Sequence, residues 1–103
     1  METAKRLSKS EILEYINISD DLFNKLVEYD KNLLIILNDM VEKVNSFFIQ
    51  QYNEKQTKEK TMFWFNAENQ QLANFTPKQM ILLGKHNRVM QFINYALEQN
   101  IRE

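Results

Sequence analysis

The sequence predicts an all-α protein, a small bundle of five or six helices with a long central helix and a C-terminal helical hairpin. Three observations lead to this prediction. The chain of 103 residues has one Gly and one Pro, so residues that form β-turns are scarce. Apolar residues recur at three- and four-residue spacing, which is the period of an amphipathic helix. Capping residues mark several helix starts.

Two short helices are predicted near the N-terminus. Ser8 and Glu11 fit a capping box, and a helix from Ser8 to Ile16 follows. Residues 17–19 are predicted as a turn. Ser19 suits the next N-cap, and two aspartates follow in the first turn, where the helix dipole favours negative charge. This second helix, over residues 20–29, is expected to bury Leu22, Phe23, Leu26 and Val27.

The longest periodic segment runs from Leu33 to Tyr52. Its apolar residues form a wide stripe, and polar residues cover the other face. The pattern predicts a central core helix. A homodimeric coiled coil is the alternative, but the segment lacks the sustained heptads that a coiled coil needs.

The next segment changes from polar to aromatic. Residues 53–60 contain no apolar side chain, so we predict a solvated loop or a polar helix end, and a hinge between two halves of the chain. Residues 61–65 hold three aromatics and are predicted as a helical turn entering the core. Trp64 is expected to pack in the core rather than to form a binding hot spot. Residues 66–75 are predicted to be irregular, with Leu72 and Phe75 as anchors and Asn69 as a cap.

The C-terminal hairpin carries the clearest local signals. Thr76 is a favoured N-cap, Pro77 suits the first helical position, and Gln79 completes a capping box. A helix from Pro77 to Leu83 should follow, with Gly84 as a left-handed C-cap. The last helix is predicted over residues 87–99, and its buried face should consist of Val89, Phe92, Ile93, Ala96 and Leu97.

Composition excludes several kinds of site. The chain has no Cys, one His and one Gly, which excludes a thiolate zinc site, a multi-His metal centre and a glycine-rich phosphate loop. No nucleophile or paired carboxylate stands near His86 in a recognisable arrangement. We therefore expect no enzyme, no cofactor and no metal, and we expect His86 to face solvent.

Membrane and nucleic-acid partners are not favoured by the sequence as a whole. The longest apolar run, residues 33–37, is too short for a bilayer, and the N-terminus lacks the pattern of a signal peptide, so we expect a cytoplasmic protein. The chain carries 13 basic and 14 acidic side chains. The excess of acid lies in residues 1–54 and the excess of base in residues 55–103, which suggests different neighbours for the two parts.

Ten residues of the second half lie in the order and at the spacing of a known family: Trp64, Asn69, Leu72, Thr76, Pro77, Met80, Leu83, Gly84, Val89 and Ile93. Residues 61–100 resemble the C-terminal toxin-binding domain of antitoxins in the Xre/MbcA/ParS group. Two small residues, usually glycines, follow the Asn-x-x-Leu segment in that family, and here they are Ala73 and Asn74. Asn tolerates positive φ better than most residues. The family often has Pro where this chain has Gln70.

The resemblance implies an inhibitory binding module with no chemistry of its own. Its partner would be a RES-domain toxin, which resembles NAD-consuming enzymes, and it would cap the toxin's active-site cleft. Residues 1–54 would then be an N-terminal helical region and residues 55–103 the toxin-binding domain. Under this hypothesis the partner contacts are Lys85, His86, Arg88, Gln99, Asn100 and Arg102. The motif residues with structural roles are Trp64, Asn69, Leu72, Thr76, Pro77 and Gly84.

Two other functions stay open. Many members of this family carry an N-terminal helix-turn-helix, and residues 8–29 resemble a degenerate one. Asp20 and Asp21 in the first turn of its second helix would repel DNA phosphates, so DNA binding is not favoured. The other function is a homo-oligomeric interaction module, assembled as a homodimer on the stripe from Leu33 to Tyr52.

Overall fold

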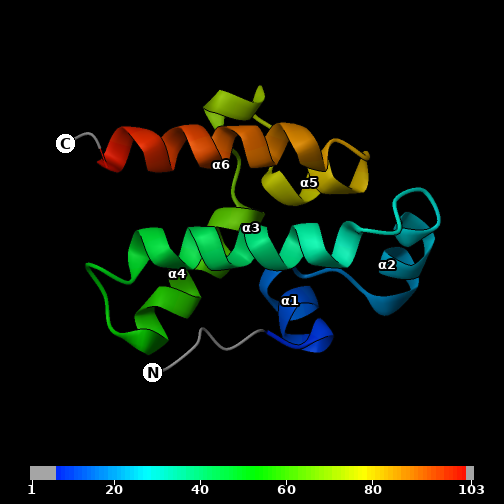
Figure 1. Ribbon diagram of the computed structural model, residues 1–103, viewed down its shortest axis with the longest axis horizontal. Helices are drawn as coiled ribbons and strands as arrows, with labels where there is room; N and C mark the ends of the chain where they lie inside the picture. Colours follow the sequence, from blue (N-terminus) through cyan, green and yellow to red (C-terminus); the bar gives the residue numbers. More distant parts are fainter. Residues whose placement is uncertain (1–6, 102–103) are drawn as a thin grey trace.

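The computed structural model describes residues 7–101, and side chains up to residue 99. This part of the chain forms six α-helices and one 3-10 turn, without a strand (Figure 1). The all-α prediction is confirmed. The elements are α1 (Lys9–Ile16), α2 (Asp20–Val27), α3 (Leu33–Phe48), α4 (Glu54–Asn66), the 3-10 turn η1 (Gln70–Leu72), α5 (Pro77–Leu82) and α6 (His86–Ile101).

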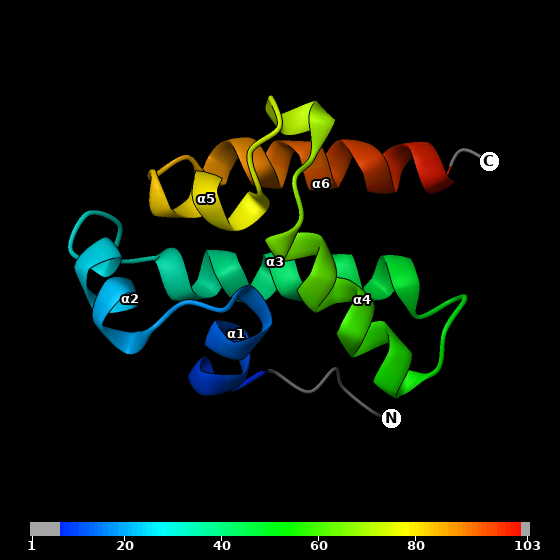
Figure 2. The same ribbon diagram turned by 180° about the vertical axis from the view of Figure 1, so that it is seen from behind.

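The central helix α3 lies between two groups of helices. In Figures 1 and 2, α5 and α6 lie on one side of α3, and α1 and α4 lie on the other. α3 and α6 run side by side. The hydrogen bond from Lys43 Nζ to Asn94 Oδ1, 2.8 Å long, joins the two helices near their middles. α3 is therefore the element against which both halves of the chain pack.

The apolar stripe of α3 is largely buried within the chain itself. Leu33, Leu37, Met40, Val41 and Val44 are buried, and they belong to a single hydrophobic core that includes residues of every α-helix. The other members of the stripe, Leu34, Phe47 and Phe48, are half-buried. Helices of the same chain therefore cover most of this stripe.

The first two helices begin as the sequence predicts. Ser8 Oγ accepts the backbone N–H of Glu11 at 3.2 Å, and the Ser8 N–H donates to Glu11 Oε1 at 2.8 Å, which completes a capping box. Ser19 Oγ caps α2 through the N–H of Leu22. The prediction that Leu22 is buried is wrong, because this side chain is 42% exposed. Phe23 on the adjacent position is the residue of α2 that enters the core.

The polar segment 53–60 is helix rather than loop. Asn53 and Gln56 form a capping box, with Asn53 Oδ1 accepting the Gln56 N–H at 2.8 Å, so α4 starts inside this segment. Thr57 and Thr61 occupy the buried face, and Thr61 Oγ1 donates a hydrogen bond to Asn45 Oδ1 of α3. Of the two alternatives that the sequence left open, the polar helix end is confirmed. Buried threonines explain why the apolar pattern did not show this helix.

The connection between α4 and α5 contains two successive left-handed residues. Asn69 Oδ1 accepts the Gln71 N–H at 2.9 Å and caps η1. Ala73 (φ 58°) and Asn74 (φ 69°) then reverse the chain. Both residues adopt the left-handed conformation although neither is a glycine. Leu72 is buried, whereas the second expected anchor, Phe75, is 43% exposed.

The hairpin of α5 and α6 begins with a capping box and turns on a Schellman motif. Thr76 and Gln79 exchange two hydrogen bonds of 2.9 Å, and Pro77 opens α5. Gly84 has a φ of 79°, its N–H donates to Ile81 O, and the next N–H, of Lys85, donates to Met80 O at 2.8 Å. These are the two hydrogen bonds of a Schellman motif. The predicted C-cap role of Gly84 is confirmed.

Candidate partner-binding surface

The predicted contact residues that the structure describes do not form one cluster. Lys85 and Arg88 are exposed at the start of α6, and Gln99 is exposed near its end. A helix rises 1.5 Å per residue, so about 16 Å of helix separates Arg88 from Gln99. Arg102 and the side chain of Asn100 lie outside the described residues. The predicted contacts whose side chains the structure describes therefore lie toward the two ends of α6.

His86 does not face solvent, contrary to the sequence-based expectation. It is the first residue of α6, it is 8% exposed, and its Nε2 lies 2.9 Å from Oδ2 of Asp30. Asp30 belongs to the segment between α2 and α3, 56 residues away. Because an ionised carboxylate only accepts hydrogen bonds, Nε2 carries the hydrogen in this contact.

The partners of Asp30 stabilise its ionised form. The backbone N–H of Asn32 donates to Oδ1 at 2.9 Å, and His86 donates to Oδ2. The Asn32 hydrogen bond first, and the His86 hydrogen bond and charge next, lower the pKa of Asp30 below its ordinary value of 3.8. Asp30 therefore stays charged near neutral pH and joins the α2–α3 segment to α6.

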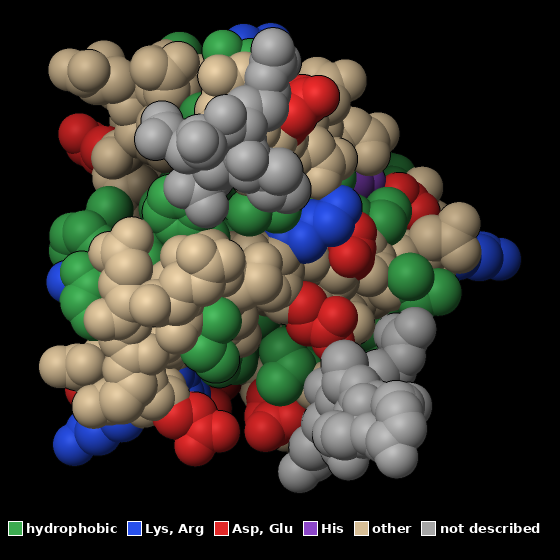
Figure 3. Space-filling model, turned by 60° about the vertical axis from the view of Figure 1, so that its left-hand side comes forward, with side chains coloured by type: hydrophobic (Ala, Val, Ile, Leu, Met, Phe, Trp, Pro, Cys, Tyr) green, Lys and Arg blue, Asp and Glu red, His purple; other side chains and the backbone are tan. Residues whose placement is uncertain are grey.

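A pocket of about 460 Å³ lies at this junction. We call it the corner pocket. Tyr29 and Leu83 on its rim are 89% and 59% exposed, although both are large and apolar. In Figure 3, seen from one side, only a small part of the histidine (purple) reaches the surface. The pocket is lined by Leu26, Tyr29, Asp30, Leu33, Ile81, Leu82, Leu83, Gly84, His86 and Asn87.

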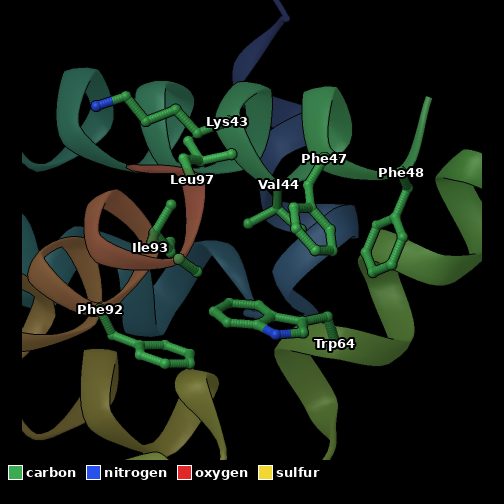
Figure 4. Close-up of a pocket in the computed structure, with 9 residues that line it drawn as sticks. Lys43, Val44, Phe47, Phe48, Trp64, Phe92, Ile93 and Leu97 are labelled. Carbon is green, nitrogen blue, oxygen red and sulfur yellow. The ribbon is translucent and has the colours of Figure 1, made fainter. Parts of the chain in front are cut away.

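A second pocket, of about 170 Å³, lies between α3, α4 and the second half of α6. We call it the aromatic pocket. Trp64 is half-buried in its wall, where it stacks on Phe92 (centroids 6.2 Å apart, planes at 7°) and meets Phe65 edge-on at 5.0 Å. Figure 4 shows Trp64 and Phe92 among the side chains around the opening. The lining residues are Lys43, Val44, Phe47, Phe48, Trp64, Phe92, Ile93, Ala96 and Leu97.

Neither pocket presents a recognisable catalytic or metal site among the described residues. Of these residues, only Tyr29 brings a hydroxyl to the corner pocket beside His86 and Asp30. Within residues 7–101, no group of three or more His, Asp or Glu side chains is placed to hold a metal ion. No helix of this described part is long and apolar enough to cross a membrane.

In the segment that resembles a helix-turn-helix, the first turn of the second helix lies on the surface. Asp20 and Asp21 are exposed in the first turn of α2. The cation beside them is Lys9, whose Nζ is 3.6 Å from Asp20 Oδ1. The acidic start of α2 is therefore partly neutralised within the chain, but it offers DNA no cationic face in that described turn.

The sequence did not indicate that Tyr29 and Asp30 line the corner pocket. Asp30 looked like an ordinary residue between two helices, and nothing in its spacing indicated a contact with His86. Only the chain fold brings the two together, so no local signal was available. The remaining motif residues, Asn69, Thr76, Pro77 and Gly84, have the capping and turning roles described above, and Leu72 is buried.

Comparison of the sequence with models of protein families gives no match, and comparisons with curated proteins and with solved structures give none either.

Proposed function

We propose that this protein is an antitoxin-like inhibitor without catalytic activity, which binds a RES-type toxin and caps its active site in the cytoplasm. The proposal rests on the resemblance of residues 61–100 and on the chemistry of the surface at the start of α6. We name Tyr29, Leu83, Lys85 and Arg88 the corner surface. It includes two of the predicted contact residues, and His86 lies beneath it.

The observation that carries the proposal is the placement of Lys85 and Arg88. Both are exposed, one just before α6 and one in its first turn, and that turn contains no acidic residue. The N-terminal end of a helix carries partial positive charge, so cations there are unfavourable. Neither side chain forms an ion pair within the described residues. An acidic partner would compensate both charges.

The apolar neighbours of these cations support the same role. Tyr29 and Leu83 would each lose a large exposed apolar area on contact with a partner, and this loss stabilises a complex. Aromatic residues and Arg are enriched at protein interfaces. The Schellman turn at Gly84 and the Asp30–His86 hydrogen bond hold both sides of the surface, so little ordering is needed on binding.

The test begins with the tagged full chain, expressed in its native host and isolated with its bound proteins. Mass spectrometry should identify a stoichiometric RES-type partner. The purified partner should consume NAD, and addition of this protein should stop that reaction. Recovery of the bait alone, while the partner gene is expressed, would refute the proposal. Self-association or DNA binding would then be the functions to test.

Variants then locate the contact. Leu83→Asp and Arg88→Glu should each weaken binding of the partner by about tenfold or more, and raised salt should weaken the wild-type complex. Ile35→Asp is the matched control for Leu83→Asp, because Ile35 is 61% exposed on α3. Equal binding by Leu83→Asp and Ile35→Asp, both folded by circular dichroism, would exclude the corner surface as the interface.

A further inference from the structure

The aromatic pocket has the size of one ring. Its volume is about 170 Å³, whereas pockets for drug-sized molecules reach about 300–1,000 Å³. An engineered cavity of about 150 Å³ with aliphatic and aromatic walls binds benzene. The volume therefore fits a single six-membered ring with a short substituent.

The described walls of this pocket are apolar and carry no unpaired charge. The charged residue among them, Lys43, contributes its aliphatic stem, and in Figure 4 the amine points away from Trp64. The Lys43 amine is 3.3 Å from Asp39 Oδ2 and 2.8 Å from Asn94 Oδ1. A charged ligand would find no free counter-charge on these walls and would lose its hydration. The pocket therefore suits an uncharged ligand.

The rings of the wall are arranged to accept another ring. Trp64 and Phe92 are stacked, while Phe47 and Phe48 meet edge-on with centroids 5.4 Å apart. Aromatic pairs in these geometries contribute stabilisation beyond their buried area. A ring in the pocket would contact both pairs, so an aromatic ligand should bind better than a saturated one of equal size.

Hydrogen bonds that join α3 to α6 and to α4 fix the positions of the walls. Lys43 joins α3 to α6, and the Thr61–Asn45 bond joins α4 to α3. The small side chain of Ala96 lines the pocket from α6, where a larger residue would fill it. The space is therefore formed before a ligand arrives, which lowers the cost of binding.

We propose that the aromatic pocket between α3, α4 and α6 is a binding site for an uncharged molecule that contains a single aromatic ring. The site is separate from the corner surface, so the failure of either proposal leaves the other testable.

Trp64 provides a direct probe of this site, because it is the single Trp of the chain. In a ¹⁵N-labelled sample it gives one indole N–H resonance. Titration of the full chain with benzyl alcohol should shift this resonance saturably, with a Kd of about 1 mM for a ligand of this size. Absence of a saturable shift up to about 50 mM, well above the Kd expected for so small a ligand, would overturn the proposal.

Two ligands of similar size test the chemical class. Benzoate keeps the ring and adds a charge, and it should bind at least about tenfold more weakly than benzyl alcohol. Cyclohexylmethanol keeps the neutral head group and removes the aromatic ring, and it should also bind more weakly. Benzoate binding as tightly as benzyl alcohol would refute an uncharged class, and equal binding of cyclohexylmethanol would refute an aromatic one.

Variants test the location. Ala96→Leu should fill the pocket and abolish the saturable shift, while Gln91→Leu, at an exposed position of the same helix, should bind like the wild type. Leu97→Phe fills the same pocket from the next position, and it takes the place of Ala96→Leu where that variant does not fold. Wild-type affinity in a folded filling variant would place the ligand elsewhere and overturn the proposal.

Discussion

The corner pocket and the aromatic pocket lie toward opposite ends of α6, and they are built with different chemistry. The corner pocket is held by a hydrogen bond between Asp30 and His86, which are far apart in the sequence, and by the turn at Gly84. The aromatic pocket is held by stacked rings and by helix-to-helix hydrogen bonds outside it. One helix thus takes part in two surfaces that should respond to different changes in the chain and the solvent.

The two pockets differ because different kinds of segment meet at each of them. The corner joins two short non-helical connections, and polar contacts with defined directions are needed to fix them. The aromatic pocket joins three helices whose backbones are already hydrogen-bonded internally, so ring packing is sufficient there. We expect pH to affect the corner and ring substitutions to affect the aromatic pocket.

The largest effect should come from Phe65, which contacts the core that both regions share. Phe65 is fully buried, so Phe65→Ala should lower the free energy of unfolding by about 3–5 kcal/mol. Phe63→Ala is the control on the same helix. Phe63 is 72% exposed, and its loss should change stability by less than about 0.5 kcal/mol. Urea denaturation measures both values, and similar losses would contradict the assigned burial.

Phe92→Leu should affect the aromatic pocket alone. The change keeps an apolar side chain and removes the ring that stacks on Trp64, at a cost of about 1 kcal/mol. The near-ultraviolet circular dichroism of Trp64 should change with it. Tyr95→Leu is the control, because Tyr95 lies on the outer side of α6. A Trp64 signal that is unchanged in Phe92→Leu would argue against the stacked pair.

Gly84→Ala should destabilise the turn of the corner pocket by about 1 kcal/mol. An added Cβ meets no atom within 4 Å, so the loss comes from the positive φ alone. Ala73→Gly is the reverse experiment at a second left-handed position, and it should stabilise the protein by about 0.5 kcal/mol. Shifts of the urea midpoint in opposite directions are expected, and a stabilised Gly84→Ala would contradict this assignment.

Protonation of Asp30 in acid should destabilise the contact between Asp30 and His86. The loss of stability should be smaller than in the three substitutions above, because the Asp30 carboxylate is partly exposed. The pKa of Asp30 is lower in the folded protein than its ordinary value of 3.8. The resulting stabilisation is complete above pH 3.8 and is lost as pH falls through the lowered pKa. In denaturant titrations below this pH, the wild type should lose stability more steeply than Asp30→Asn. If stability falls equally with pH in the wild type and in Asp30→Asn, the Asp30 carboxylate does not contribute to stability.

Local signals predicted much of the fold and little of the candidate site. The capping boxes at Ser8 and Thr76 and the left-handed Gly84 depend on a few neighbouring residues, so the sequence is enough to place them. The pattern did not decide between loop and helix at the start of α4, because the buried face there uses Thr57 and Thr61 rather than apolar residues. The exposure of Leu22 and Phe75 was not predicted, since the sequence does not show which apolar residues find a neighbour.

The sequence by itself determined the all-α class, the starts of α1, α2 and α5 and the C-terminal hairpin, because these follow from contacts within one or two helical turns. Only the tertiary structure decided that His86 is buried against Asp30 and that Trp64 lines a pocket. These outcomes depend on contacts between residues distant in the chain. Such contacts are selected by the packing of whole helices, and a local pattern carries no information about them.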